Sequence, residues 1–325
     1  MKAMVLAAGL GTRLRPYTDV LPKPLFPILG VPLIEWVLSG LSRAGVTDAV
    51  VNLHHLPEAI PAALGDSACG VRLSWSKEPL VLGTGGGLSA VRDFFAGEDA
   101  FFLHNGDVFT DWDLGGLVAR HRQSGATATL ALADPPDMPW ARLVEVDDGR
   151  VVGIRDRPET RGGPKFVFSG VSVLSGAVLD TLPRDGVSCL VEQGLIPLLA
   201  SGRHIAGIPM GGEFCDIGTP DRFLDLNRSL IPDAGRRLAA AGFEVPRELE
   251  PGVWVHESAV VSRAATLVAP VLIGPNASVG DRAGVGPGAV VCARARVAGL
   301  ARVSEAVVFP GGEVNRPARG MVTAS

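Results

Sequence analysis

The chain has 325 residues, 47% of them hydrophobic and 20% charged, with a formal net charge of -4. This length suggests two domains, and the apolar content predicts buried cores, which excludes the disordered and low-complexity classes. The net negative charge excludes a strongly basic protein that binds nucleic acid or an anionic membrane surface.

The cysteines and the apolar segments favour a cytoplasmic protein. The four cysteines are far apart in the sequence and form no CxxC pair, so neither a disulfide framework nor a zinc site is expected. The longest uncharged stretch, residues 264–280, contains two prolines, an asparagine and two glycines, which is not typical of a membrane span. Residues 1–10 are followed too soon by Arg13 for a signal peptide and predict a buried strand instead.

The first part of the chain alternates short apolar runs with helical patterns. Strands are predicted over residues 3–7, 49–53, 71–76, 100–104 and 127–133. Helices are predicted between them, over residues 32–44, 56–64, 85–95 and 113–124. This alternation predicts βαβ units in a mainly parallel sheet, with ligands beyond the carboxyl ends of the strands. The loops to consider are then residues 8–23, 78–87 and 105–111.

The pattern changes after residue 142. A hairpin is predicted over residues 143–154, with its turn at Asp148-Gly149, and a further strand over 166–174. A helix over 188–200 and strands over 204–209 and 214–217 follow. Thr219 should cap the next helix, with Pro220 in its first turn. A last helical piece covers 236–241, and a linker covers 242–252.

A repeat of period six follows the linker. Nine aliphatic residues keep this spacing without a break: Val255, Val261, Leu267, Ile273, Val279, Val285, Val291, Val297 and Val303. Period six fits neither a helix nor strand alternation and is typical of the hexapeptide parallel β-helix, in which one aliphatic side chain per short face points to the coil axis. Three hexapeptides per coil would make about three coils.

These patterns predict four segments. Residues 1–232 should form the α/β domain, residues 233–252 a helical piece and linker, residues 253–309 the hexapeptide β-helix and residues 310–325 a tail.

The loop after the first strand combines glycines with cations. Residues 8–13 read AGLGTR; position 14 is leucine, which excludes a dinucleotide fingerprint, and the Gly-Lys-Ser/Thr of a Walker A loop is absent. Backbone N–H groups of such a glycine turn approach phosphate, and Arg13 follows at once. Lys23 lies ten residues later between two prolines, where it offers a compact point charge. A tight turn with surface cations is the alternative, which the spacing of Arg13 and Lys23 disfavours.

Two acidic residues follow predicted strands. Asp107 comes after the strand over residues 100–104, and Asp216 comes after Phe214-Cys215. Two carboxylates together with substrate phosphates are the usual means of holding Mg²⁺. Either residue taken alone would be read as a turn or capping aspartate.

Five segments in this order resemble the motifs of sugar-1-phosphate nucleotidyltransferases. They are LAAGLGTRLRP at 6–16, PKPL at 22–25, LGTGG at 82–86, NGDV at 105–108 and DIGTP at 216–220. The layout with a carboxyl-terminal hexapeptide β-helix resembles mannose-1-phosphate guanylyltransferases. The resemblance implies an α/β fold with a Rossmann-like mixed, mainly parallel sheet flanked by helices, of the nucleotide-diphospho-sugar transferase type, followed by a short left-handed parallel β-helix.

The resemblance also implies a reaction and its residues. A sugar 1-phosphate oxygen would attack the α-phosphorus of an NTP in line and release pyrophosphate, so charge neutralisation and positioning supply most of the catalysis. Arg13 and Lys23 would stabilise the transition state, and Asp107 and Asp216 would hold Mg²⁺. The implied nucleotide-binding residues are Leu6, Ala8, Gly9, Gly11, Thr12, Glu78, Gly83, Thr84 and Asn105, and the implied sugar-phosphate-binding residues are Asp156, Arg157, Lys165, Ser169 and Gly170.

Glu78 is the residue that indicates which nucleotide base is bound. Family members specific for uracil or thymine often place glutamine five residues before Gly83, where this chain has Glu78. A carboxylate only accepts hydrogen bonds and suits the N1–H and N2–H₂ donors of guanine, which favours GTP. Glu78 as an exposed loop residue is the alternative.

The sugar side departs from the common family pattern. The usual Glu-Lys-Pro is Asp156-Arg157-Pro158, the usual Asn-Ala-Gly is 168–170 FSG, and the usual Tyr/Phe-Gly is Trp140-Ala141. The TGGG and FSG segments resemble the N-acetylmuramate-1-phosphate uridylyltransferase branch, which lacks a β-helix. A uridylyl- or thymidylyltransferase acting on another hexose or amino-sugar 1-phosphate is therefore the alternative to mannose 1-phosphate.

Two other hypotheses are a catalytically silent subunit and a β-helix that transfers acyl groups. A catalytically silent regulatory subunit would be expected to lose one of the four charged residues, and all four are present. An acyltransferase β-helix typically offers a catalytic histidine and a longer array, whereas His256 is the only histidine after position 204. We therefore expect an assembly or regulatory module and a homo-oligomer formed through the β-helix or the catalytic domain.

Overall fold

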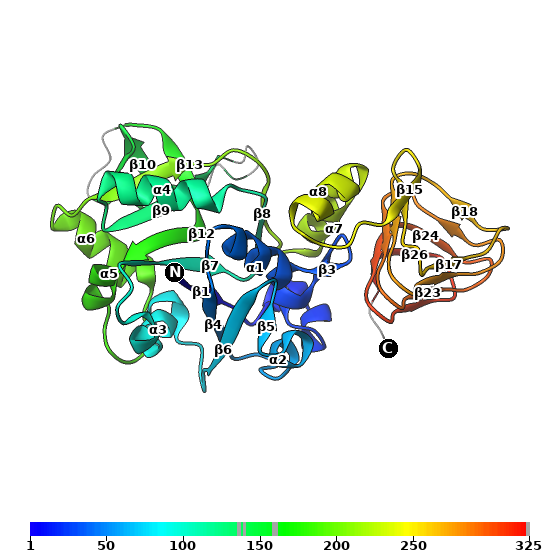
Figure 1. Cartoon of the computed structure of the whole chain (residues 1–325), viewed down its shortest axis with the longest axis horizontal. Helices are drawn as coiled ribbons and strands as arrows, with labels where there is room; N and C mark the ends of the chain where they lie inside the picture. The colour runs from blue at the N-terminus through cyan, green and yellow to red at the C-terminus, as the bar shows by residue number, and fades with distance from the viewer. Residues whose placement is uncertain (135–137, 139–140, 158–161, 323–325) are drawn as a thin grey trace. The chain divides into compact units, whose positions relative to one another are not determined.

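The computed structural model describes residues 1–134, 138, 141–157 and 162–322 (Figure 1). The chain forms two compact units, the first made of Met1–Leu10 and Val37–Phe214 and the second of Gly11–Trp36 and Cys215–Ser325. Residues 11–36 and 215–232 thus belong to the same compact unit as the repeat segment.

The first unit is built on a mixed sheet of ten strands. Their order is β10 (Arg142–Asp147), β11 (Arg150–Ile154), β13 (Ile205–Pro209), β9 (Ala128–Ala133), β12 (Lys165–Ser175), β7 (Ala100–Asn105), β1 (Lys2–Leu6), β4 (Asp48–Leu53), β6 (Val71–Lys77) and β5 (Ser67–Ala68). Strands β6, β4, β1 and β7 are parallel, as is the pair β13–β9. Strand β12 runs antiparallel to both β7 and β9, and the pairs β10–β11, β10–β12, β11–β13 and β5–β6 are antiparallel as well. The sheet is therefore mixed, and the predicted mainly parallel arrangement is found only across β7, β1, β4 and β6 and in the pair β13–β9.

Helices cover this sheet. They are α1 (Leu33–Arg43), α2 (Ala59–Leu64), α3 (Gly83–Ala90), η4 (Arg92–Phe95), α4 (Leu114–Ser124), α5 (Gly176–Thr181), η6 (Leu190–Leu195) and α6 (Ile196–Ala200), with the short strand β8 (Val108–Thr110) after β7. Helix α4 packs on β9, β12 and β13 (Figure 1). The predicted helix over 85–95 is divided into α3 and η4, and that over 188–200 begins as the π-helical turn η6.

The core of the first unit is aliphatic and aromatic. Its most deeply buried members come from the central strands and from α3 and α5, and they include Met4, Leu88, Phe101, Leu103, Leu130 and Val178. None of the helices among the described residues is long and apolar enough to cross a membrane.

The second unit contains helices and a stack of short strands. The chain forms η1 (Thr12–Leu14), η2 (Tyr17–Asp19), η3 (Lys23–Leu25), β2 (Pro27–Ile28) and β3 (Val31–Pro32), and later β14 (Phe214–Asp216), α7 (Pro220–Leu230), η7 (Ile231–Asp233) and α8 (Ala234–Ala240). Thr219 caps α7 as predicted, with its side chain accepting from the Arg222 N–H.

The strand stack, residues 253–322, follows β15 (Arg247–Glu250). Its strands are β16 (Val253–Val255), β17 (Val260–Val261), β18 (Thr266–Leu267), β19 (Val271–Ile273), β20 (Ser278–Val279), β21 (Gly284–Val285), β22 (Ala289–Val291), β23 (Arg296–Val297), β24 (Arg302–Val308), β25 (Glu313–Val314) and β26 (Ala318–Val322). The first strands of the stack pair in parallel with strands three hexapeptides further along, as Val253 does with Val271 and Val260 with Ser278. The nine aliphatic residues at period six lie in or against the core of this stack.

The stack extends beyond its predicted end. The segment predicted as a tail, residues 310–325, contains β25 and β26, which pair with β23 and β24. Val314 and Met321 are buried, so apolar packing continues after the strict spacing of six has ended.

Candidate active site

The ends of β1 and β7 form a topological switch point of the sheet. From β1 the chain continues to β4 and β6 on one side, while β7 pairs with the other side of β1. Leu6 lies opposite Asn105, and the Gly106 N–H donates to the Leu6 carbonyl at 2.8 Å. A Cβ at Gly106 would lie 2.9 Å from that carbonyl, so glycine is required there. Ligands of open α/β sheets bind beyond such strand ends, where Ala8, Gly9 and Asp107 lie.

A buried network fixes the entrance to α3. The Asn52 side chain accepts from the Ala7 N–H at 2.7 Å and donates to Glu78 Oε1 at 2.7 Å. Glu78 Oε2 accepts from the Leu82 N–H at 3.0 Å. Glu78 is only 5% exposed, so it is not the exposed loop residue of the alternative reading. Both carboxylate oxygens instead hold protein groups that border the predicted nucleotide-binding loops.

Replacing Asn52 with alanine should lower the free energy of unfolding by about 3 kcal/mol, because it leaves the buried Glu78 carboxylate and the Ala7 N–H short of a partner. Urea unfolding followed by circular dichroism measures this cost. Ser74→Ala on the exposed face of the neighbouring strand β6 is the control. A loss no larger than the control's would show that Asn52 does not hold Glu78.

The glycines that open α3 serve close packing. Gly85 N–H and Gly86 N–H both donate to the Ser188 carbonyl, and a Cβ at Gly83 would lie 2.6 Å from that same oxygen. Thr84 Oγ1 accepts from the Leu190 N–H at 3.0 Å. The predicted binding residues Gly83 and Thr84 therefore also fix the segment that leads into η6.

Asn105 and Gly170 lie in contact. Gly170 has a φ of 81°, and a Cβ there would overlap the Asn105 side chain. Ser169 is buried at a register shift of β12, where its hydroxyl donates to the Ala131 carbonyl and accepts from the Val171 N–H. Ser169 therefore shapes the strand and presents Gly170 to Asn105.

The other predicted sugar-phosphate residues form ion pairs. Lys165 Nζ lies 2.7 Å from Asp156 Oδ1, and Glu192 accepts from both Arg155 (2.6 Å) and Arg157 (2.5 Å). Hydrogen bonds from Arg157 and then Arg155 lower the pKa of the Glu192 carboxyl. The structure thus places Asp156 with Lys165, and Arg157 with a carboxylate that the sequence did not single out. Pro158 and Trp140 lie outside the described residues.

His104 lies in β7, three residues before Asp107, and is 1% exposed. Burial lowers its pKa to about 4, against the smaller opposing effects of its hydrogen bond to the Asn105 carbonyl and of Asp107. Burial likewise lowers the pKa of His121, whose Nδ1 lies 2.9 Å from Thr129 Oγ1.

The buried His104 should make stability depend on pH. Its pKa is lower in the folded state than the ordinary 6.5, so the unfolded chain binds more protons between these values. Its contribution is therefore complete above pH 6.5 and is lost as the pH falls towards 4, by about 3 kcal/mol in all. Urea unfolding at several pH values should show a smaller loss for His104→Asn than for the wild type. His204→Asn, at a half-buried position, is the matched control. Equal losses in wild type and His104→Asn would contradict the prediction.

In the second unit, Gly11 and Gly218 position Arg13. Gly11 has a φ of 60° and caps η1, and its carbonyl accepts from the Thr18 hydroxyl at 3.0 Å. Thr12 and Arg13 in η1 are exposed. A Cβ at Gly218 would lie 2.7 Å from Arg13 Nη2, so the DIGTP segment lies directly against this guanidinium.

Lys23 and Asp216 form an ion pair. Lys23 Nζ lies 2.9 Å from Asp216 Oδ1, with side-chain exposures of 8% and 31%. Lys23 begins η3 between Pro22 and Pro24, which fix φ on both sides of it. The second unit thus brings together three of the four predicted charged residues, Arg13, Lys23 and Asp216.

Two of the predicted site residues, Asp107 and Asp216, carry the kind of oxygen donor that Mg²⁺ prefers. Among the described residues, no three His, Cys, Asp or Glu side chains group closely enough to hold a metal by themselves. Protein-bound Mg²⁺ commonly has one or two carboxylates and completes its shell with substrate phosphates and water. Asp107, half-buried after β7, and Asp216, at the end of β14, are donors of this kind.

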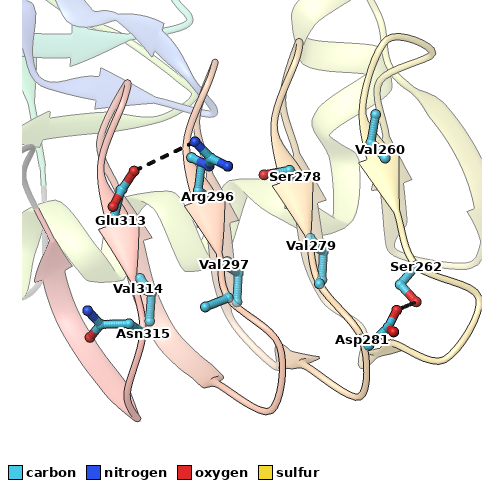
Figure 2. Close-up of a pocket in the computed structure, with 12 residues that line it drawn as sticks. Val260, Ser262, Ser278, Val279, Asp281, Arg296, Val297, Glu313, Val314 and Asn315 are labelled. Atoms are coloured by element: carbon cyan, nitrogen blue, oxygen red, sulfur yellow. Dashed lines mark hydrogen bonds and ion pairs between the residues drawn. The ribbon is translucent and has the colours of Figure 1, made fainter.

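The strand stack has a hollow of its own, on the sheet of β17, β20, β23 and β25 (Figure 2). Ser262 Oγ donates to Asp281 Oδ1 at 2.5 Å, and Arg296 Nη1 lies 4.0 Å from Glu313 Oε1. The Arg296 and Glu313 side chains are 71% and 66% exposed, so water screens their attraction. None of the predicted site residues is among the residues that line the hollow.

Comparison with known proteins indicates the protein family to which this chain belongs. A family model described as nucleotidyl transferase matches residues 2–232. A mannose-1-phosphate guanylyltransferase of Mycobacterium tuberculosis is 32% identical over 286 residues, which are 86% of this chain and 76% of that protein. An N-acetylmuramate alpha-1-phosphate uridylyltransferase of Neisseria meningitidis is 37% identical over 227 residues, which are 67% of this chain and 94% of that protein. A UTP–glucose-1-phosphate uridylyltransferase of Synechocystis is 28% identical and covers 95% of this chain and 87% of its own length.

The chain belongs to the sugar-1-phosphate nucleotidyltransferases of the nucleotidyl transferase family. The solved structure of a UDP-glucose pyrophosphorylase from Acinetobacter baumannii matches with a TM-score of 0.61 and 20% identity over 71% of this chain and 93% of that one, and it shares the α/β fold.

Sequence reasoning missed several residues of the site. Asn52 and Glu192 were not singled out, although each is a polar residue beside an apolar run, which is a detectable signal. Gly218 was quoted only within a motif, and its approach to Arg13 is visible only in three dimensions.

Proposed function

We propose that this enzyme transfers a guanylyl group from GTP to a mannose-type hexose 1-phosphate, with Mg²⁺, and releases pyrophosphate. The pairing of Lys23 with Asp216 beside Arg13 carries the proposal, because it gathers two cations and a carboxylate in one compact unit. The guanylyltransferase relative supports the substrates, since its similarity covers 86% of this chain and so extends into the strand stack.

The reaction would depend on charge and position. The nucleophile is already a phosphate oxygen, so no strong base is needed, and the barrier comes from bringing two anions together. The exposed Arg13 guanidinium suits two phosphate oxygens at once, whereas Lys23 offers a fixed point charge. Asp107 and Asp216 would hold Mg²⁺, which when bound would place further positive charge on the phosphate oxygens.

The base is assigned from relatives rather than from Glu78. Oε1 and Oε2 of Glu78 already accept from Asn52 and Leu82, so both oxygens hold protein groups that border the loop leading into α3. We infer that Glu78 acts on the base through the loop that leads into α3.

Uridylyl transfer to an amino-sugar 1-phosphate is the second candidate. Its support is the N-acetylmuramate uridylyltransferase relative, at 37% identity, and the Gly170–Asn105 contact formed by the FSG segment.

Pyrophosphate release separates the candidates. GTP, UTP, dTTP, CTP and ATP would each be combined with mannose, glucose, N-acetylglucosamine and N-acetylmuramate 1-phosphates in the presence of Mg²⁺. We expect the highest kcat/KM for GTP with mannose 1-phosphate. Turnover with UTP but not GTP would establish the second candidate, and no turnover with any pair would contradict the activity itself.

The strand stack is proposed to be a short left-handed parallel β-helix that serves assembly or regulation. Its support is the parallel pairing of strands three hexapeptides apart and the aliphatic core. We further propose a cytoplasmic homo-oligomer, and light scattering of the purified chain would measure its mass.

A further inference from the structure

Three phenylalanines form a buried cluster in the second unit. The Phe26 ring lies 5.5 Å from Phe223 and 5.2 Å from Phe309, and Phe223 lies 5.7 Å from Phe309, all with steep interplanar angles. Their exposures are 0%, 0% and 2%. Edge-to-face pairs of this kind add to the energy of burial and fix ring orientation. Phe26 follows η3, Phe223 lies in α7, and Phe309 comes directly after β24 of the strand stack.

Phe26 is linked directly to Lys23. The Phe26 N–H donates to the Lys23 carbonyl at 3.0 Å, and the Phe26 carbonyl accepts from the Leu33 N–H. Pro24 lies between Lys23 and Phe26 and limits how this turn can adjust. A shift of the Phe26 ring therefore moves the backbone that carries Lys23.

Phe223 leads to the other partner of the ion pair. Asp216 lies three residues before Thr219, the cap of α7, and Phe223 is in the first turns of that helix. Helix α7 also holds the segment after Phe26, because Asn227 accepts from the Leu29 N–H and donates to the Pro27 carbonyl. Phe309 thus contacts both supports of the Lys23–Asp216 pair.

Phe309 itself is firmly held. Its N–H donates to the Val322 carbonyl of β26 at 2.7 Å, and its carbonyl accepts from the Gly312 N–H at 2.8 Å. The preceding Val308 belongs to the core of the strand stack, whereas Phe309 packs on Phe26 and Phe223. It is also the only phenylalanine after Phe243.

We propose that Phe309 is a positioning residue for Lys23, through which the strand stack holds the Lys23–Asp216 pair in place for phosphoryl transfer. The proposal rests on the proposed function of Lys23. It gives the stack a role in catalysis that requires neither a ligand nor a second subunit.

Kinetics provide the first test. Because small displacements of a positioned group are costly, Phe309→Ala should lower kcat by about 10²-fold with little change in the KM of the nucleotide, and Phe309→Leu should restore most of the rate. Val297→Ala, which truncates the core of the stack, is the matched control. A loss in Val297→Ala as large as in Phe309→Ala would overturn the proposal, since loosening the stack alone would then suffice.

Amine labelling provides a test that does not depend on activity. The chain has only four lysines, so reductive methylation can be followed at each by peptide mass spectrometry. Lys77, with 57% of its side chain exposed, serves as the internal reference for Lys23. The ratio of the Lys23 rate to the Lys77 rate should rise about tenfold in Phe309→Ala through easier local opening, and it should stay near the wild-type value in Val297→Ala.

The kinetic and labelling measurements together distinguish a failure of the positioning role from a failure of the proposed function of Lys23. An unchanged labelling ratio in Phe309→Ala would overturn the positioning role. A raised ratio with unchanged turnover would instead overturn the role of Lys23 in the reaction, and with it the catalytic consequence drawn here.

Discussion

Replacing Lys23 with methionine should lower kcat by about 10³-fold, because a preorganised charge beside a transferring phosphoryl group stabilises charge that develops in the transition state. The Lys23 side chain is 8% exposed and is held 2.9 Å from Asp216, so no other cation can readily take its place. Methionine keeps the apolar length of the side chain, which preserves the packing around η3. Initial rates of pyrophosphate release at saturating substrates measure the effect.

Two further variants serve as controls for this experiment. Lys77→Met removes a largely exposed lysine that pairs with Glu58, and it should leave kcat unchanged. Lys23→Arg keeps the charge but enlarges the head group, and it should recover only part of the loss. If the kcat of Lys23→Met lies within threefold of the wild-type kcat, Lys23 is not a catalytic residue.

Asp107→Asn should abolish most metal-dependent turnover, with a fall in kcat/KM of about 10³-fold, because a metal ion contributes several kcal/mol to such reactions. Asp107 follows β7 at the switch point, where Gly106 is bound to the Leu6 carbonyl, so the substitution should not disturb the fold. Rates measured over a Mg²⁺ titration should show a weaker dependence on the ion.

The matched control lies a few residues away. Asp113 caps α4 by accepting from the Gly116 N–H, and asparagine caps helices about as well as aspartate does. Asp113→Asn should therefore keep both the rate and the Mg²⁺ dependence. An Asp107→Asn enzyme with an unaltered Mg²⁺ profile would exclude Asp107 from the metal site.

Many elements could be predicted because their pattern is local. Strand β4 and helices α1 and α4 lie within two residues of their predicted ranges, since apolar runs and helical periodicity follow from burial on a face. The direction of β12 could not be predicted, because a strand pattern does not specify its neighbours. Helix α5 was also missed: its six residues are too few to establish a helical period.

Only part of the candidate site could be predicted from the sequence. Arg13, Lys23, Asp107 and Asp216 were predicted from residue type and from their place beside strand ends or glycines. The hydrogen-bond and ion-pair partners of the predicted residues could not be identified from the sequence. Glu78 supports a loop through Asn52, Ser169 shapes β12, and Arg157 is paired with Glu192.

The sequence by itself determined the types of charged residue available to a site and the period of the repeat. Both features depend only on which residues are present and how far apart they lie in the sequence, so the unbroken aliphatic spacing of six can be recognised without a structure. Only the tertiary structure decided that residues 11–36 pack with the strand stack and that Lys23 meets Asp216, 193 positions away. Contacts of this kind depend on the packing of whole elements, so no local pattern encodes them.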